Sequence, residues 1–86
     1  MFYTYILKSE KNGRIYMGYT NNLRKRLNEH NKGKSYYTNR DKPYLLIYYE
    51  ACLNKDDAES RELFLKSGMG KRYVKNRLKR FLSLTG

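Results

Sequence analysis

The sequence predicts one small α+β domain over residues 1–86, with elements in the order strand, strand, helix, strand, helix, helix (β-β-α-β-α-α). Three runs are rich in β-branched and aromatic residues, which is typical of strands. Three other segments carry apolar residues at helical spacing. The chain has 86 residues, and a chain of this length builds a single hydrophobic core.

The first two strands, residues 2–8 and 14–19, are predicted to form a hairpin. Asn12 and Gly13 lie between them, and both residue types tolerate the positive φ of a tight turn. The two strands are therefore expected to be antiparallel.

The register of this hairpin decides which tyrosines lie together. A two-residue turn places Tyr5 opposite Thr20. Because side chains alternate along a strand, Tyr5 and Tyr16 then lie on the same sheet face. A loop longer by two residues preserves this arrangement, whereas a shift of one residue destroys it.

A basic helix is predicted after the hairpin. Thr20, Asn21 and Asn22 are good N-cap residues, and the helix is expected to run to about Lys32 and to end at Gly33.

This helix is expected to turn two polar side chains toward the sheet. Leu23 and Leu27 define its buried stripe, and at ~100° per residue Arg26 lies at the edge of that stripe. His30 lies one turn beyond Arg26 on the same side. The two preceding cations, Arg24 and Lys25, point outward.

The second half of the chain supplies a strand and a helix. Residues 34–43 are polar and are expected to form a loop near the ligand. The third strand, residues 44–50, follows Pro43, which cannot donate a ladder hydrogen bond. Asn54 is predicted to cap a helix over residues 55–66.

Glu62 is expected on the inner face of that second helix, at about 40° from Ala58 on the helical wheel. A carboxylate there is costly to bury without a partner. Gly68 and Gly70 are expected to break the chain before a third helix over residues 71–83, which packs on the core and presents a basic face to phosphates.

The charge points to a polyanionic partner. Nineteen Lys and Arg residues against eight Asp and Glu give a net charge of +11. Nucleic acid is the leading candidate, and an anionic membrane surface or an acidic protein is a weaker one. The residues predicted to contact nucleic acid are basic side chains of the three helices and the loop: Arg24, Lys25, Lys34, Lys66, Lys71, Arg72 and Lys75.

Cys52 is the only cysteine, so no intrachain disulfide forms and a reducing, cytoplasmic setting is expected. No apolar run approaches the ~18 residues of a membrane span. The apolar start of the chain lacks a basic segment before it and is not expected to be a signal peptide. No membrane association is predicted, and the oligomeric state is left open.

The candidate site combines Tyr5, Tyr16, Arg26, His30 and Glu62. Hydrolysis of a phosphodiester needs a nucleophilic water, charge relief at the phosphate and help for the leaving oxygen. A lone carboxylate holds a divalent cation that keeps its waters, a guanidinium forks onto phosphate oxygens, and a tyrosine accepts a proton if a nearby cation lowers its pKa.

These residues resemble the GIY-YIG nuclease superfamily, in particular its small single-domain bacterial members. Tyr3-Thr4-Tyr5 corresponds to the first tripeptide and Tyr16-Met17-Gly18 to the second. Arg26 follows the second tyrosine by the family's ten positions. His30 matches many small members. The segment Arg61-Glu62-x-x-Leu65-Lys66 matches the metal-binding helix.

The resemblance implies a three-stranded, mainly antiparallel sheet flanked by helices and one-metal cleavage of a phosphodiester in DNA, with single-stranded or branched forms as candidate substrates and RNA as an alternative. It implies Tyr16 as general base and Tyr5 as a residue that positions the water. Arg26 would stabilise phosphorane-like charge, Glu62 would hold Mg²⁺ or Mn²⁺, and His30 would assist the base or the phosphate.

Structural alternatives exist for each residue. The tyrosines could be packing residues, Arg26 a surface cation and His30 a helix-end residue. Glu62 could pair with Arg61, Lys66 or Arg26. Tyr3 and Tyr19 also depart from the family pattern, which leaves a catalytically weak or inactive nucleic-acid-binding module as the alternative function. A basic domain that binds an acidic protein is a third hypothesis.

Overall fold

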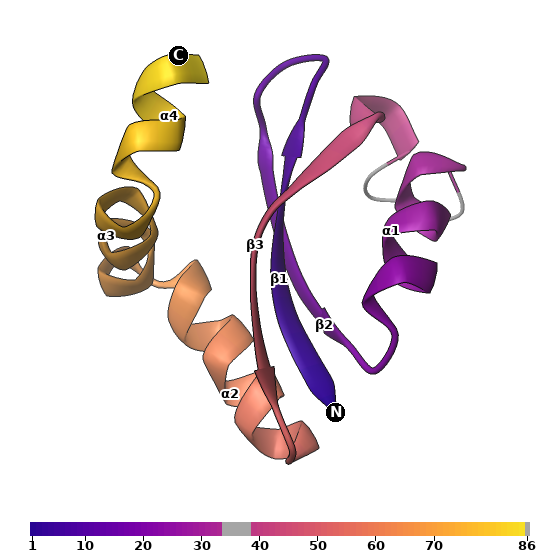
Figure 1. The fold of residues 1–86 in the computed structure, drawn as a ribbon, viewed down its shortest axis with the longest axis vertical. Helices are drawn as coiled ribbons and strands as arrows, with labels where there is room; N and C mark the ends of the chain where they lie inside the picture. Colours follow the sequence, from indigo (N-terminus) through magenta and orange to yellow (C-terminus); the bar gives the residue numbers. More distant parts are fainter. Residues whose placement is uncertain (34–38, 86) are drawn as a thin grey trace.

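The predicted α+β class is confirmed. The computed structural model describes residues 1–33 and 39–85. Strands β1 (Phe2–Ser9), β2 (Ile15–Thr20) and β3 (Tyr44–Cys52) form one antiparallel sheet in the order β2-β1-β3. A short 3-10 turn, η1 (Asn39–Asp41), precedes β3. The sheet separates α1 (Leu23–Asn31) from α2 (Lys55–Lys66), α3 (Gly68–Arg77) and α4 (Lys79–Thr85) (Figure 1).

The hairpin register differs from the prediction by two residues. Tyr5 lies opposite Gly18, not Thr20, so the loop is longer by two residues than a two-residue Asn12-Gly13 turn. The side-chain period of a strand is two. The expected consequence is therefore unchanged, and Tyr5 and Tyr16 share a sheet face.

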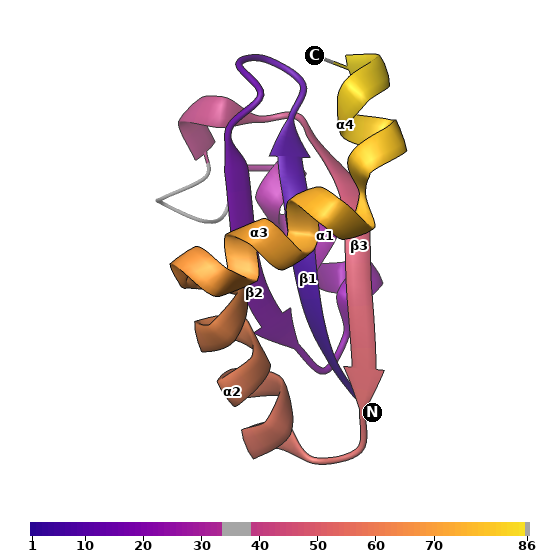
Figure 2. The same cartoon turned by 90° about the vertical axis from the view of Figure 1, so that its left-hand side faces the viewer.

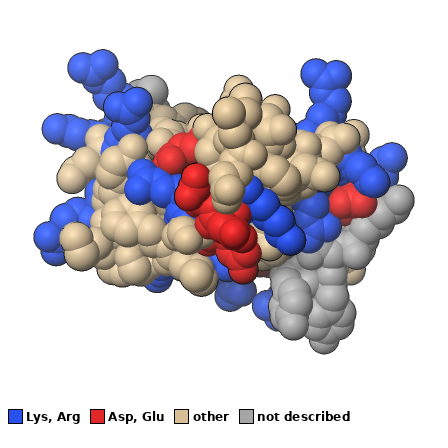
Figure 3. Space-filling model, turned by 90° about the horizontal axis from the view of Figure 1, so that it is seen from below, with Lys and Arg blue, Asp and Glu red and all other residues tan. Residues whose placement is uncertain are grey.

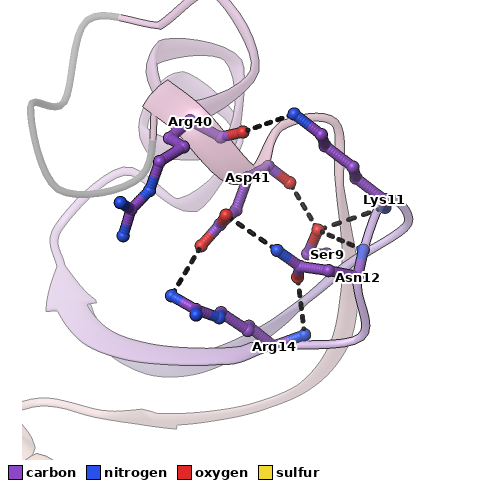
Figure 4. Close-up of polar contacts among 6 residues, drawn as sticks. All are labelled: Ser9, Lys11, Asn12, Arg14, Arg40 and Asp41. Atoms are coloured by element: carbon purple, nitrogen blue, oxygen red, sulfur yellow. Dashed lines mark hydrogen bonds and ion pairs between the residues drawn. The ribbon is translucent and has the colours of Figure 1, made fainter.

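Contacts with a distant segment explain the longer loop. The Ser9 hydroxyl accepts hydrogen bonds from the backbone N–H groups of Lys11 and Asn12 and donates to the carbonyl oxygen of Asp41. The Asn12 side chain donates to the Asp41 carboxylate at 2.8 Å, and Arg14 lies 3.9 Å from the same carboxylate. Figure 4 shows this network. It holds the hairpin loop against η1, so strand pairing ends at Ser9.

Each face of the sheet has its own apolar cluster. On the α1 side, Tyr5, Leu7 and Tyr44 are buried against Leu23 and Leu27 of the helix. The opposite face packs against α2 and α3, and its buried members are Ile6, Met17, Leu65 and Val74. The central strand β1 supplies side chains to both clusters.

The ends of the first two helices agree with the prediction. Asn22 caps α1 by accepting from the Lys25 N–H, and Gly33 follows the helix with a φ of +77°. Asn54 caps α2 by accepting from the N–H groups of Asp56 and Asp57. Side-chain acceptors at these positions satisfy N–H groups that the helix leaves unpaired.

The single third helix predicted over residues 71–83 is wrong in its extent. The structure has two helices, α3 beginning at Gly68 and α4 beginning at Lys79, separated at Leu78. The break before α3 falls at Ser67, whose extended backbone and hydroxyl cap the helix. Gly70 lies inside α3. A Cβ at this position would clash with the backbone of Phe64. The glycine therefore permits close packing of α3 on the end of α2.

No helix within the described residues is long and apolar enough to cross a membrane.

Candidate active site

The candidate residues gather beside β2, which is an edge strand. Helix α1 covers one face of the sheet, and α2 approaches from the other face and contacts β1 and β2. Because nothing pairs with the outer edge of β2 in the described part of the chain, side chains from both layers meet beside it. The views in Figure 1 and Figure 2 show α1 and α2 on opposite sides of this strand.

Tyr5 and His30 form the buried centre of this arrangement. Their side chains are 2% and 0% exposed. The Tyr5 hydroxyl lies 3.0 Å from Nε2 of His30. The rings of Tyr16, Tyr5 and Tyr44 lie edge-on to the His30 imidazole, with centroids 4.9, 6.0 and 6.1 Å away. His30 is therefore packed among three tyrosines and does not lie in solvent at the helix end.

Gly18 allows the Tyr5 ring to reach the edge of the sheet. A Cβ built at Gly18 would lie 2.5 Å from the Tyr5 hydroxyl oxygen. The ring of Tyr5 therefore lies directly over Gly18, so its hydroxyl is positioned above the edge strand β2. A glycine inside a strand is a recognised sign of such close approach.

Burial raises the pKa of Tyr5 to about 12, although the hydrogen-bonded Arg26 guanidinium acts in the opposite direction. Arg26 therefore lowers the Tyr5 pKa, as expected of a nearby cation, but the effect of burial is larger. Its hydroxyl stays protonated at neutral pH. Because arginine only donates, the Tyr5 oxygen accepts from Arg26, and the same hydroxyl shares a hydrogen bond with Nε2 of His30.

Arg26 faces the site, as predicted. Its side chain is 34% exposed, whereas its neighbours Arg24 and Lys25 are exposed. One guanidinium nitrogen also lies 3.2 Å from the Glu29 carboxylate, which fixes the side chain and leaves other donors of the fork for an anion.

His30 is neutral at physiological pH. Burial lowers its pKa to about 4, and the Arg26 charge acts in the same direction. A buried, neutral imidazole does not contact a phosphate directly. Its hydrogen bond instead fixes the position of the Tyr5 hydroxyl.

Glu62 comes from α2 and reaches the same region. Its side chain is 15% exposed, and its carboxylate lies 3.4 Å from the Lys66 ammonium. Its negative charge contributes to the raised pKa of Tyr5, so the two groups interact across the sheet edge. Of the three cations considered as partners, Lys66 pairs with Glu62, whereas Arg61 pairs with Glu50 at 2.9 Å.

The donor set suits a weakly held, hydrated cation. Within residues 1–33 and 39–85, no cluster of three or more His, Cys, Asp and Glu side chains could enclose a metal. Glu62 is a single, largely buried carboxylate, and its charged partner is the flexible side chain of Lys66. One carboxylate is compatible with Mg²⁺, which keeps several waters and binds substrate phosphates.

The residues predicted to contact nucleic acid lie in two places. Arg24 and Lys25 are on the exposed side of α1. Lys66, Lys71 and Lys75 line a groove beside α3, and Arg72 is exposed on the same helix. Lys34 lies outside the described residues. The end of the molecule where α2 begins is not uniformly basic. Acidic side chains gather near the middle of that face (Figure 3).

Sequence reasoning misses two contributors to this region. Tyr44 contacts the His30 ring, and no local signal marks it, because the contact depends on β3 pairing beside β1. Gly18 enters the sequence analysis only as part of a motif, although its position inside a strand could have indicated the close approach of Tyr5.

Comparisons with known proteins match most of this chain. A family model described as the GIY-YIG catalytic domain matches residues 1–77. A UPF0213 protein of Clostridium perfringens is 46% identical over 67 residues, which cover 77% of this chain and 71% of that protein. A UPF0213 protein of Pediococcus pentosaceus is 40% identical over 85 residues, covering 98% of this chain and 88% of that protein. No solved structure gives a significant match.

Proposed function

Because this chain belongs to the GIY-YIG catalytic domain family, which is a nuclease family, we propose that it is a metal-dependent endonuclease that hydrolyses phosphodiester bonds in DNA. The whole of residues 1–86 acts as one catalytic domain in this proposal. RNA is the alternative substrate.

One observation carries the proposal. Four elements supply the candidate side chains near the edge of β2: Tyr5 from β1, Tyr16 from β2, Arg26 from α1 and Glu62 from α2. The Tyr5 hydroxyl interacts with Arg26, Tyr16 and Glu62. A net charge of +11 favours a polyanionic substrate around this position.

The residues divide the work of hydrolysis between them. Tyr16, in its phenolate form, is the proposed general base that takes a proton from the attacking water and becomes a neutral phenol. The new bond joins the water oxygen to phosphorus as the bond to the leaving oxygen breaks. Arg26 donates to the phosphate oxygens, where negative charge accumulates. The leaving oxygen takes its proton from solvent.

Tyr5 and His30 are positioning residues in this scheme. With a pKa of about 12, Tyr5 keeps its proton, and its hydroxyl is hydrogen-bonded to Nε2 of His30. This hydrogen bond holds the oxygen that accepts from Arg26. The resemblance implied that Tyr5 positions the water and that His30 assists the base or the phosphate; we propose the positioning role because both side chains are buried.

Glu62 would hold Mg²⁺ or Mn²⁺, which supplies charge relief at the phosphate and the leaving oxygen when it is bound. Lys66 would then be released from Glu62 toward the substrate backbone. The family generally uses divalent cations, and the single carboxylate does not distinguish between these two.

A cleavage panel tests the proposal. Purified protein is incubated with end-labelled single-stranded, duplex and branched DNA, and with single-stranded RNA, in Mg²⁺, in Mn²⁺ and in EDTA. We expect cleavage of at least one DNA substrate that requires the metal. Cleavage of RNA alone would correct the substrate, and absence of cleavage on every substrate would refute the nuclease proposal.

The alternative, a nucleic-acid-binding module without activity, is favoured by one observation. Lys66 already neutralises the Glu62 carboxylate, which weakens it as a metal ligand. This alternative predicts salt-sensitive DNA binding without product, and affinity that is unchanged in the Glu62→Ala variant.

A further inference from the structure

A groove of about 790 Å³ on the sheet face opposite α1 is lined by residues of β2, the hairpin loop, α3 and α4. Figure 2 shows α3 in front of that face of the sheet. Its floor is mainly apolar and includes Ile15, Met17 and Val74. Four lysines lie around it: Lys8, Lys66, Lys71 and Lys75. None of the described residues that line it is Asp or Glu.

The groove adjoins the candidate active site. Tyr16, the proposed base, is among the residues that line the groove, although its ring lies on the other face of the sheet against His30. Lys66 belongs to both regions, because it lines the groove and pairs with Glu62 at 3.4 Å. A strand that occupies the groove would therefore reach the proposed cleavage position by passing Lys66 and the edge of β2.

We propose that this groove binds an unpaired nucleotide of the substrate strand beside the cleaved phosphodiester. The inference rests on the proposed nuclease function and assigns its substrate-positioning site. The nucleobase lies on the apolar floor, and the flanking phosphates lie against the lysines.

Charge and size favour this occupant over others. Four cations around a wall whose described residues include no carboxylate are complementary to a phosphate backbone. A volume of about 790 Å³ is within the ~300–1,000 Å³ typical of small-ligand sites. The apolar floor fits the face of a base, which is hidden by stacking in a duplex and available in an unpaired strand.

Ile15 gives the floor an accessible apolar side chain. It is 45% exposed on the edge strand, whereas Met17 and Val74 are 8% and 7% exposed and belong to the core. Substitution of Ile15 therefore alters the groove without removing a buried core residue. This makes Ile15 the most informative position for a test of base binding.

Binding is measured by fluorescence anisotropy with the full chain carrying Glu62→Gln, in EDTA, so that affinity is separated from cleavage. The probe is a labelled single strand of about 12 nucleotides, compared with the same strand lacking its central bases and with a duplex. Ile15→Ser is expected to weaken binding of the complete strand about fivefold or more and to leave the abasic strand unaffected.

The lysines are tested by salt dependence. Each lost contact between a lysine and a phosphate of a single strand reduces the slope of log affinity against log salt by ~0.7. The double variant Lys71→Ala with Lys75→Ala should therefore reduce this slope by about 1.4. The matched control, Lys42→Ala with Lys55→Ala, also removes two positive charges from the same Glu62→Gln chain, but neither residue lines the groove. Leu53→Ser, at a side chain 82% exposed, is the control for Ile15→Ser.

Several results would overturn the groove assignment. One is an equal change in salt slope for the groove lysine pair and the control lysine pair. Another is that Ile15→Ser weakens binding of the complete strand and of the abasic strand equally. The third is a wild-type dimer in light scattering that Ile15→Ser converts to a monomer. The assignment and the nuclease proposal fail separately. Groove-dependent binding without cleavage by the wild-type chain refutes only the nuclease, and cleavage with groove-independent binding refutes only the groove.

Discussion

Substitution of Gly18 by alanine should displace the side chain on which the proposed site is built. A Cβ at Gly18 would lie 2.5 Å from the Tyr5 hydroxyl oxygen and 2.7 Å from the carbon that bears it. Since real Cβ contacts do not fall below 3.0 Å, the ring must move by at least 0.5 Å (3.0 minus 2.5). Tyr5 is 2% exposed, so the movement occurs within packed surroundings.

The free energy of unfolding should fall by about 0.5–4 kcal/mol. Overpacking of a core contributes ~1–3 kcal/mol, and a weakened hydrogen bond between Tyr5 and His30 contributes ~0.5–1.5 kcal/mol. The lower entropy of an unfolded chain with alanine offsets ~0.4–1 kcal/mol of this loss. Displacement of the Tyr5 oxygen also moves Arg26, and cleavage should fall roughly tenfold or more.

Urea unfolding and cleavage are measured for Gly18→Ala and for Gly68→Ala. Gly68 is a matched control, because a Cβ there meets nothing within 4 Å. The control should be as stable as the wild type or more so, with unchanged cleavage. If Gly18→Ala behaves like this control in both assays, the close contact of Tyr5 with Gly18 does not hold the site together.

Two further variants separate the fold from the site. His30 has a pKa lowered to about 4 from 6.5. The unfolded chain then binds more protons between these values, and stability is full above pH 6.5 and falls toward pH 4, by at most about 3 kcal/mol. Urea titrations across this range should show the loss for the wild type and not for His30→Gln. Arg61 lies against the Phe64 and Tyr73 rings, at 4.7 and 4.9 Å, and pairs with Glu50. Arg61→Ala should lower the melting temperature because packing is removed, whereas cleavage measured well below that temperature should be unchanged; loss of cleavage in fully folded protein would contradict a purely structural role.

Local signals in the sequence are enough for most of the fold. Asn22 and Asn54 are recognisable as helix caps because their side chains satisfy N–H groups within three residues along the chain. The shared face of Tyr5 and Tyr16 follows from strand alternation, which survives a shift of two residues.

The remaining features depend on contacts between distant segments. The hairpin loop is set by the contact of Ser9 with Asp41, which are separated by 32 positions. From the sequence, Gly70 is expected to break the chain before a helix. In the structure it permits the close approach of α3 to the backbone of Phe64, a contact that local sequence does not indicate.

The site is predictable in its residue types and less so in its electrostatics. Helical spacing places Arg26 toward the sheet and its two basic neighbours outward, and the structure agrees. Spacing also suggests that a cation lowers a tyrosine pKa, whereas burial dominates at Tyr5 and raises it. Burial is a property of the whole fold, so the sign of this shift is not accessible from spacing alone.

A comparison of Glu62→Gln with Glu59→Gln tests the central claim most directly. Both substitutions remove one negative charge from α2, but Glu62 is 15% exposed and interacts with Tyr5, whereas Glu59 is exposed. Cleavage of DNA in Mg²⁺ should fall at least about 10²-fold for Glu62→Gln and remain at the wild-type rate for Glu59→Gln, with both variants folded. Equal rates for the two variants would contradict the assignment of Glu62 to the active site.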